Sequence, residues 1–572
     1  MAGSNISDIY STMRYQGRQR FGEGHPFVVA GSSMIRQPII HAGDSYYFGD
    51  IYEPSKIRSA FSGSGKMPGS STAYLDHLDY LTDNGWPQLR YLADFMRVTA
   101  SPPKWKFLSH EDMQERASRA KAVLLVFHPD RVQKLNINSI QQLQDALDQM
   151  PGVNDAHDFP PHLFVVEDLS RDVIECLGMH LDVDPMLFRG HISDYVWYNI
   201  RDPWIELPDL EVIYRQRSCF SIRYAQTRYF RDGESLRNAR DETSRFNILR
   251  RVDGNGNWET GLDLPSSNIG TIRSKMSFWV QPRNSKIPKS VVAILLVDPS
   301  VTEGHPIWGG YNNLVPCPSV HQDRCDRRSR GSMLDETIYW LEKMSADEIR
   351  LIPQDPRILC RKPLGIVCSE WTMLLRYANT RFSQLEWEVE DPDLRHKGEG
   401  LALTLENLHT WRRRFPIYKN IISEGMERVI RRESFLYSTR DSLRVLEKDF
   451  EILLSNLDDL HHRAERMMSV VTAVLSIEES QKALQQNRSL GRLTYLAALF
   501  VPLSFISSFF SMNEDITRLG KTFWIYLAVA LPVTVTALFV TRYSHYLAKT
   551  LQRLIRRLEE KLHTSHSGDR NR

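Results

Sequence analysis

The sequence is constrained most by a long apolar run near its end, Leu493–Met512, which contains no charged residue. A second apolar run, Phe523–Val540, begins after a link of about ten residues. At a rise of about 1.5 Å per residue, about 20 helical residues cross a hydrocarbon core about 30 Å thick. We therefore expect two transmembrane helices, at residues 493–512 and 523–541, joined by a short loop at residues 513–522.

The rest of the chain has the composition of a water-soluble protein. Charged residues make up 25% of the 572 residues, and the mean hydropathy is −0.38. The net charge is only +2, so no overall electrostatic field indicates a nucleic-acid partner, and none is expected. The six cysteines form no disulfide-like framework, which favours a reducing compartment for the soluble part.

Basic residues lie at the outer ends of the two apolar runs, whereas the charges in the link between them balance. They are Lys482, Arg488 and Arg492 before the first run, and Arg542, Lys549, Arg553, Arg556, Arg557 and Lys561 after the second. Because such residues accumulate on the cytosolic side of a membrane, we expect a multi-pass protein with both termini cytosolic and loop 513–522 external. The plasma membrane is expected, with an internal membrane as the alternative. The tail at 542–572 is expected to be a basic cytosolic segment near anionic lipid headgroups.

Short strand-like segments recur through the first half of the chain. Each is rich in β-branched and aromatic residues and ends in turn residues. They are Ala122–Phe127, Leu163–Val166, Phe220–Tyr224, Ser277–Val280 and Val291–Val297. Between the second and the third, Asp172–Leu181 carries apolar residues at helical spacing. Strands interleaved with helices predict a cytosolic α/β domain at residues 106–330. Residues 1–105 are expected to be irregular and partly disordered.

The sequence after residue 330 has the pattern of helices. Residues 331–425 are expected to form a helical part of the cytosolic domain. From Met426 to Leu490 there is no proline or glycine, and apolar residues recur at steps of three, four and seven. One buried stripe of this kind predicts a continuous stalk helix at residues 426–492, about 100 Å long. A coiled-coil spacer is the alternative, although this segment leads directly into the first apolar run.

Sequence motifs of enzymes are missing. We find no nucleophile elbow, kinase motif set or metalloprotease helix. The turn-rich segment Ser62–Ser70 lacks the first glycine of a phosphate loop and the Ser/Thr that follows its lysine. We expect no enzymatic activity and no cofactor.

The order of these parts resembles the CorA family of magnesium channels, in which a cytosolic α/β domain is followed by a long helix that continues into the first of two spans. The family's first span typically reads L-T-x-x-A-x-x-F-x-P-L-T-F-I-x-x-x-x-G-M-N, and Leu493–Asn513 matches in register without a gap. The block Val165–Ser170 is similar to a segment of the family's cytosolic domain, and fungal CorA-like proteins are the most similar branch. The resemblance implies a homopentamer in the lipid bilayer, with a pore lined by the first transmembrane helix.

Ser511, Met512 and Asn513 take the place of the family's Gly-Met-Asn motif. Mg²⁺ holds its water molecules tightly, so a ring of amide and carbonyl oxygens can bind the hydrated ion at a pore mouth. The resemblance assigns this role to Asn513, with the Ser511 carbonyl beside it. Glu514 and Asp515 follow directly and would concentrate cations at the entrance.

One face of the first span is expected to line the pore. Steps of three and four from Ser511 give Ser508, Ser504, Val501, Ala497, Leu493, Leu490 and Asn487. This face is small and weakly polar near the mouth and apolar towards the cytosol, which predicts a hydrated path with a hydrophobic constriction. Small residues also pack membrane helices together, so helix packing is the alternative role for the serines.

Mg²⁺ is expected both as the transported ion and as a candidate regulatory ion bound between cytosolic domains. Acidic residues that could bind a regulatory ion are numerous, and no spacing singles out a pair. They include Glu167, Asp168, Asp182, Asp184 and the cluster at residues 388–393. The regulatory site is therefore left unassigned.

Two departures from the family pattern bear on function. Ser511 replaces a glycine, which narrows the allowed backbone conformations, and residues 513–522 lack the proline of the family's acidic loop. The predicted function is passive, potential-driven movement of a divalent cation, Mg²⁺, through a homo-oligomeric pore. The alternatives are a non-conducting or regulatory relative and a membrane-anchored scaffold or signalling protein. The choice between Mg²⁺ and Co²⁺, Ni²⁺ or Zn²⁺ stays open.

Overall fold

The structure is a computed structural model that describes most of the chain between residues 72 and 543. The described residues are 72–99, 109–150, 159–193, 210–248, 250, 252–254, 268–282, 291–310, 314–316, 319–321, 331–390, 400–432, 442–511, 523–539 and 543. The chain divides into two compact units, Met1–Met468 and Ser469–Arg572, and each is described by itself.

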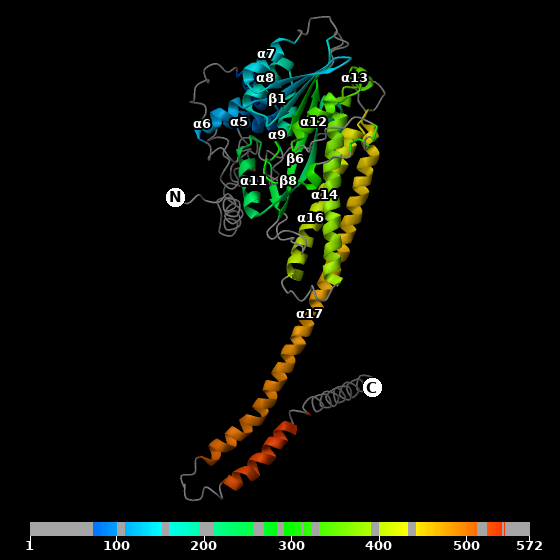
Figure 1. Cartoon of the computed structure of the whole chain (residues 1–572). Helices are drawn as coiled ribbons and strands as arrows, with labels where there is room; N and C mark the ends of the chain where they lie inside the picture. Colours follow the sequence, from blue (N-terminus) through cyan, green and yellow to red (C-terminus); the bar gives the residue numbers. More distant parts are fainter. Residues whose placement is uncertain are drawn as a thin grey trace, which may run out of the picture. The chain divides into compact units, whose positions relative to one another are not determined.

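The N-terminal unit is built on a mixed eight-stranded sheet (Figure 1). Its strands are β1 (Lys121–Phe127), β2 (Val132–Ile137), β3 (His162–Glu167), β4 (Cys219–Phe230), β5 (Val252–Gly254), β6 (Asn268–Val280), β7 (Val292–Val297) and β8 (His305–Pro306). The order is β2-β1-β3-β7-β6-β4-β8, with β5 paired to β6. β3 and β7 pair in parallel, and the other pairs are antiparallel. Every residue of β7 is buried, as expected for a central strand covered on both faces.

All five predicted strand segments lie in strands of this sheet, in β1, β3, β4, β6 and β7. The sequence did not indicate β2, β5 or β8. β2 is an edge strand with four consecutive exposed residues, so it lacks the alternation that marks a half-buried strand. β5 and β8 are only three and two residues long, too short for a periodic signal.

Short helices pack around the sheet. They are α4 (Ala73–Asp83), α5 (Arg90–Val98), α6 (His110–Ser118), α7 (Ile140–Asp148), α8 (Arg171–Leu181), α9 (Pro185–Ile192), α10 (Glu211–Gln216) and α11 (Gly233–Arg245), with 3₁₀ turns η2 (Pro87–Leu89) and η4 (Ile307–Gly310). α8 confirms the helix predicted at Asp172–Leu181. Residues of α4, α5, α8 and α9 share one hydrophobic core with one face of the sheet.

The prediction of an irregular region up to residue 105 is wrong for residues 73–98, which form α4 and α5. Tyr74 contacts α8 so closely that a Cβ at Gly178 would lie 2.7 Å from its ring. The Tyr74 hydroxyl donates to the carbonyl of Val183 at 2.8 Å. The α/β domain therefore begins before residue 106. These helices are short, and their docking depends on residues 100 positions away, which a local pattern does not show.

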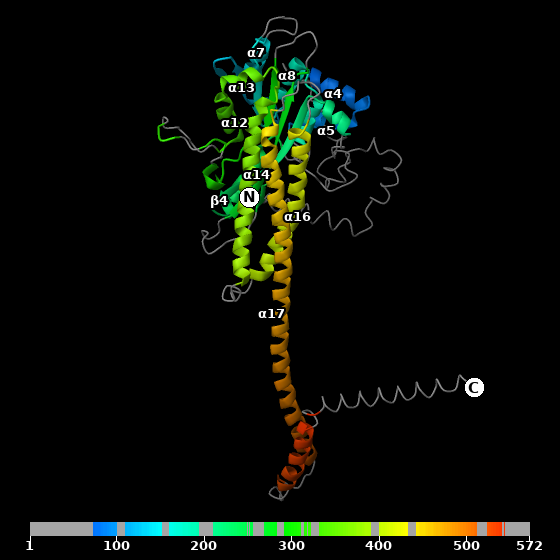
Figure 2. The same cartoon turned by 90° about the vertical axis from the view of Figure 1, so that its right-hand side faces the viewer.

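Helices dominate the rest of the N-terminal unit, as expected for residues 331–425. They are α12 (Met333–Glu342), α13 (Ala346–Leu351), α14 (Ile358–Glu390) and α16 (Gly400–Gly425), followed by a π-helical turn η5 (Met426–Ile430), a 3₁₀ turn η6 (Arg444–Leu446) and α17 (Glu447–Phe510). α14, α16 and the first part of α17 lie side by side in both views (Figures 1 and 2). α14 and α16 also contact β4, and α12 contacts β3.

The predicted stalk helix at 426–492 is not continuous. The helix that includes Gly425 ends at Ile430, and α17 begins at Glu447; residues 433–441 lie outside the described residues. α16 and α17 are antiparallel, since Lys419 pairs with Asp458 at 2.7 Å and Arg412 contacts Met468 at 3.7 Å. The absence of proline and glycine does not require a helix to continue, and the apolar spacing is the same before and after this break.

Candidate functional site

The predicted pore helix is the C-terminal part of α17. Among the described residues, one helix, Arg444–Ser508, is long and apolar enough to cross a membrane, and Phe523–Phe539 is a shorter apolar helix. α17 ends at Phe510, close to the predicted end of the first span. Pro502 lies inside this helix, where a membrane helix tolerates it if the freed carbonyl finds another partner.

Within the C-terminal unit, the helix Phe523–Phe539 packs on one face of α17. The Tyr526 hydroxyl donates to the carbonyl of Leu503 at 3.4 Å. Ile506 on α17 and Ala530 on the second helix are buried. Thr534 is also buried and satisfies its hydroxyl by donating to the carbonyl of Ala530 at 2.6 Å, which is a common arrangement in apolar helices.

The predicted pore-lining residues lie on the opposite face of α17. At 100° per residue, the centre of Val501, Ser504 and Ser508 lies about 165° from Ile506 and about 135° from Leu503. All seven predicted positions are exposed: Asn487, Leu490, Leu493, Ala497, Val501, Ser504 and Ser508. The apolar members Leu490, Leu493 and Val501 are 58–65% exposed. The second helix therefore leaves this face uncovered.

The signature motif is described only at its first residue. The Ser511 N–H donates to the carbonyl of Ser507 at 3.0 Å, so helical hydrogen bonding continues up to this residue. The backbone φ of Ser511 is not positive. The glycine-specific backbone region is therefore not used at position 511. Met512, Asn513, Glu514 and Asp515, together with loop 513–522 and the tail 544–572, lie outside the described residues.

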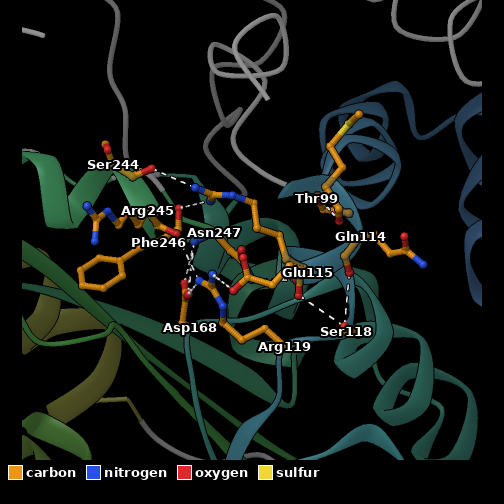
Figure 3. Close-up of polar contacts among 12 residues, drawn as sticks. Thr99, Gln114, Glu115, Ser118, Arg119, Asp168, Ser244, Arg245, Phe246 and Asn247 are labelled. Atoms are coloured by element: carbon orange, nitrogen blue, oxygen red, sulfur yellow. Dashed lines mark hydrogen bonds and ion pairs between the residues drawn. The ribbon is translucent and has the colours of Figure 1, made fainter. Parts of the chain in front are cut away.

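The block Val165–Ser170 ends β3 and begins α8, and its Asp168 has a left-handed backbone (φ 54°). The buried Asp168 carboxylate accepts the Asn247 N–H at 2.9 Å and a hydrogen bond from Arg119 at 3.1 Å (Figure 3). Arg119 also donates to the carbonyl of Arg245 at 3.1 Å, at the end of α11. Burial raises the pKa of Asp168, and Arg119 opposes that shift. This block thus connects α6, β3 and α11.

The other acidic candidates of this region also have local partners. Glu167 pairs with Lys121. Asp184 caps α9 by accepting the Met186 N–H at 2.9 Å, and Asp182 ends α8 in a left-handed conformation. Among the described residues, no group of three or more His, Cys, Asp or Glu side chains could hold a metal ion. The acidic residues at 391–393 lie outside the described residues.

One protein family matches the helical part of the chain that follows the sheet. Residues 352–543 match the family model described as "CorA-like Mg2+ transporter protein". This part of the chain is therefore similar to the CorA-like family. The matched segment spans α14, α16, α17 and the helix Phe523–Phe539, so it includes the exposed face of α17. The sequence resemblance to CorA is confirmed, whereas the fungal branch and the Ser-Met-Asn variant stay predictions.

Two solved structures are similar over most of their own length. The complete CorA magnesium transporter from Methanocaldococcus jannaschii is 12% identical, with a TM-score of 0.32, and the match covers 74% of this chain and 98% of that chain. The full-length CmaX protein is 10% identical, with a TM-score of 0.32 and the same coverage. No curated protein matches this chain.

Proposed function

We propose that the protein moves divalent cations, Mg²⁺ in the first place, across a membrane. The observation that carries this proposal is the CorA-like match over residues 352–543. The matched segment contains α14, α16 and α17 together with both apolar runs. CorA-like proteins are transporters rather than enzymes, and the match supports the proposal of divalent cation transport. The proposal extends the match to a specific pore in this chain.

The pore would be built by several copies of the chain, because one pair of helices encloses no path. The helix Phe523–Phe539 covers one face of α17, and the opposite face is free to line a central pore. Nearer the start of α17, Val470, Ile477 and Leu484 repeat every seven residues and are 47–60% exposed. Such a stripe supports association of α17 with other copies of itself. A homopentamer is the proposed assembly.

The selectivity site would lie at the mouth of the pore. Asn513 would accept hydrogen bonds from water molecules of the hydrated ion, so that Mg²⁺ is bound without losing its inner shell. Serine is compatible with this position, because the Ser511 N–H continues the helical hydrogen bonding of α17 and the residue does not need a positive φ. Glu514 and Asp515 would raise the local cation concentration at the entrance.

The path below the mouth changes from polar to apolar. Ser508 and Ser504 offer hydroxyls near the entrance, and Val501 and Ala497 follow. Leu493 and Leu490 would form a hydrophobic constriction that gates by excluding water, with Asn487 as a polar ring beneath it. A dication entering an interior that is negative by 100 mV gains about 4.6 kcal/mol, so passive uptake needs no nucleotide.

The topology that this mechanism requires has two spans, both termini in the cytosol and loop 513–522 outside. It is supported by the basic residues around Arg488 and in the tail, and the plasma membrane is the proposed location. Mg²⁺ is also the proposed regulatory ion, with no site assigned.

Magnesium uptake into liposomes tests the proposal. Purified full-length protein is reconstituted, and uptake is followed with an internal magnesium dye under an inside-negative potential. Asn513→Ala should lower the initial rate at least about tenfold, because it removes the amide from every subunit at once. Asn456→Ala, an exposed asparagine near the start of α17, is the matched control and should leave the rate unchanged. A wild type without uptake would favour a non-conducting relative, and a monomer in detergent would favour a membrane-anchored scaffold.

A further inference from the structure

The first part of α17 packs into the N-terminal unit. Its buried side chains follow one another at steps of three and four: Phe450, Leu453, Leu457, Leu460, Ala464, Met467 and Val471. Between Val471 and Ile506, none of the α17 side chains that the structure describes is buried. Contacts along this first part are therefore the ones that can fix α17 on the N-terminal unit.

Apolar packing alone leaves a helix some freedom to rotate or slide, because the hydrophobic effect has no direction. Directional contacts remove that freedom. Arg431 holds the start of α17 through Glu447 at 2.6 Å and Glu451 at 2.9 Å. Lys419 holds Asp458. Further along α17, Arg463 makes an ion pair with Glu386 of α14.

Arg463 makes four hydrogen bonds to one face of α14. Its Nε and one terminal nitrogen donate to the two oxygens of Glu386 at 2.6 and 2.5 Å, so this pair is bidentate. The terminal nitrogens also donate to Oδ1 of Asn379 at 2.6 Å and to Oγ of Ser383 at 3.0 Å. The three α14 residues are spaced by four and three positions, as on one helix face. We call these four residues the Arg463 clamp.

The bidentate pair fixes direction as well as distance. A guanidinium that meets a carboxylate through two parallel hydrogen bonds tolerates little rotation, unlike a lysine ammonium. The ion pair holds the pKa of Glu386 below its ordinary value and raises that of Arg463. The side chains are 21% and 35% exposed, so the clamp is open enough to break and reform.

We propose that the Arg463 clamp is a positioning device that sets the rotation of α17 against α14, and through it the rotation of the pore-lining face. The second half of this statement rests on the proposed function. From Glu447 to Leu490 α17 is helical without glycine or proline, so a rotation imposed at Arg463 is carried to Asn487 and Leu490, where the predicted pore-lining face begins. Arg463 itself acts through α17 and touches no ion.

The first measurement reports on position and needs no transport. Spin labels are placed at Glu479→Cys on α17 and Gln141→Cys on α7, both exposed, with Cys317 and Cys325 changed to serine. Labelled full-length chains are diluted with unlabelled ones, and the distance distribution is measured. Glu386→Ala should broaden or shift the distribution. An unchanged distribution in Glu386→Ala overturns the proposal whatever the uptake assay shows.

The second measurement is magnesium uptake by the same variants in liposomes. Glu386→Ala and Arg463→Ala should each lower the initial rate about fivefold, and the double variant should be no slower than Arg463→Ala, because either single change already breaks the bidentate pair. The exchanged pair Glu386→Arg with Arg463→Glu should recover at least half of the wild-type rate. Arg350→Ala, which breaks an exposed pair with Asp347 on α13, is the control and should leave the rate unchanged.

The outcomes separate the two proposals. A wild type without uptake refutes the proposed function, and the spin-label distribution then decides the clamp alone. Additive losses in the double variant, or an exchanged pair as slow as the single variants, would show that Arg463 and Glu386 act independently and would overturn the clamp. Equal melting temperatures of all variants exclude unfolding as the cause of a lower rate.

Discussion

Glu175→Ala should release α4 from the N-terminal unit while leaving the sheet folded. The Glu175 carboxylate on α8 is buried and accepts the N–H groups of Tyr74 at 2.7 Å and Leu75 at 3.2 Å. These groups belong to the first turn of α4, where the helix itself provides no acceptor. Thr72 at the N-cap makes no side-chain cap hydrogen bond. A carboxylate distant in sequence therefore caps this helix.

The size of the effect follows from these two hydrogen bonds. Leaving a buried donor unsatisfied costs about 1–3 kcal/mol, and bonds to charged acceptors lie in the upper part of that range. Two donors at the edge of a docked helix should therefore lower the free energy of local opening by about 2–4 kcal/mol. Because about 1.4 kcal/mol corresponds to a factor of ten, amide exchange in α4 should accelerate about 30- to 1000-fold.

Hydrogen exchange of the full-length protein in detergent, read by mass spectrometry, measures this directly. Peptides that cover α4 should lose protection, whereas peptides from β3 and β7 should keep it. Glu111→Ala removes an exposed acidic residue from the first turn of α6 and is the matched control. Exchange in α4 that stays within about threefold of the wild type would refute the reasoning.

Two further predictions concern buried charges. Burial raises the pKa of Glu370 on α14 to about 7, and the nearby Arg228 opposes this shift. The contribution of Glu370 to folding stability is therefore complete below pH 4.5, the pKa of the unfolded chain, and is lost as pH rises through about 7. Glu370→Gln should therefore raise the melting temperature at pH 8 and not at pH 4.5; an equal change at both pH values would contradict this. The Asp298 carboxylate binds the buried Arg250 guanidinium at 2.6 and 2.9 Å. Asp298→Ala removes this counter-charge and should lower the free energy of unfolding, measured in urea, by about 3–5 kcal/mol. Asp347→Ala at an exposed pair is its control, and equal losses would refute the argument.

The sequence predicted the elements whose signal is local. The strand segments from Ala122–Phe127 to Val291–Val297 are apolar runs with β-branched residues, and each lies in a strand. Asp172–Leu181 has helical spacing and forms α8. The apolar end of α17 was visible from its composition, and its resemblance to CorA agrees with the family match.

Elements that depend on distant partners were missed or misplaced. α4 is capped by Glu175, about 100 residues away, so its own sequence contains only part of the reason for its position. The helix ends at Ile430 and α17 begins at Glu447, where Arg431 binds Glu447 and Glu451, while the apolar spacing continues on both sides of this break. The role of Arg463 likewise needs α14 beside α17. The pore face was predicted from spacing, and its separation from the second helix became visible only in the structure.

We propose above all that this chain conducts magnesium through a pore with a ring of Asn513 side chains at its mouth. The initial rate of Mg²⁺ uptake into liposomes, compared between wild type and Asn513→Ala under an inside-negative potential, tests it most directly. We expect the wild type to take up Mg²⁺ at a rate that grows as the interior is made more negative. Asn513→Ala should take up at least about tenfold less. Wild-type liposomes that take up no more Mg²⁺ than empty ones, or equal rates for the two proteins, would contradict it.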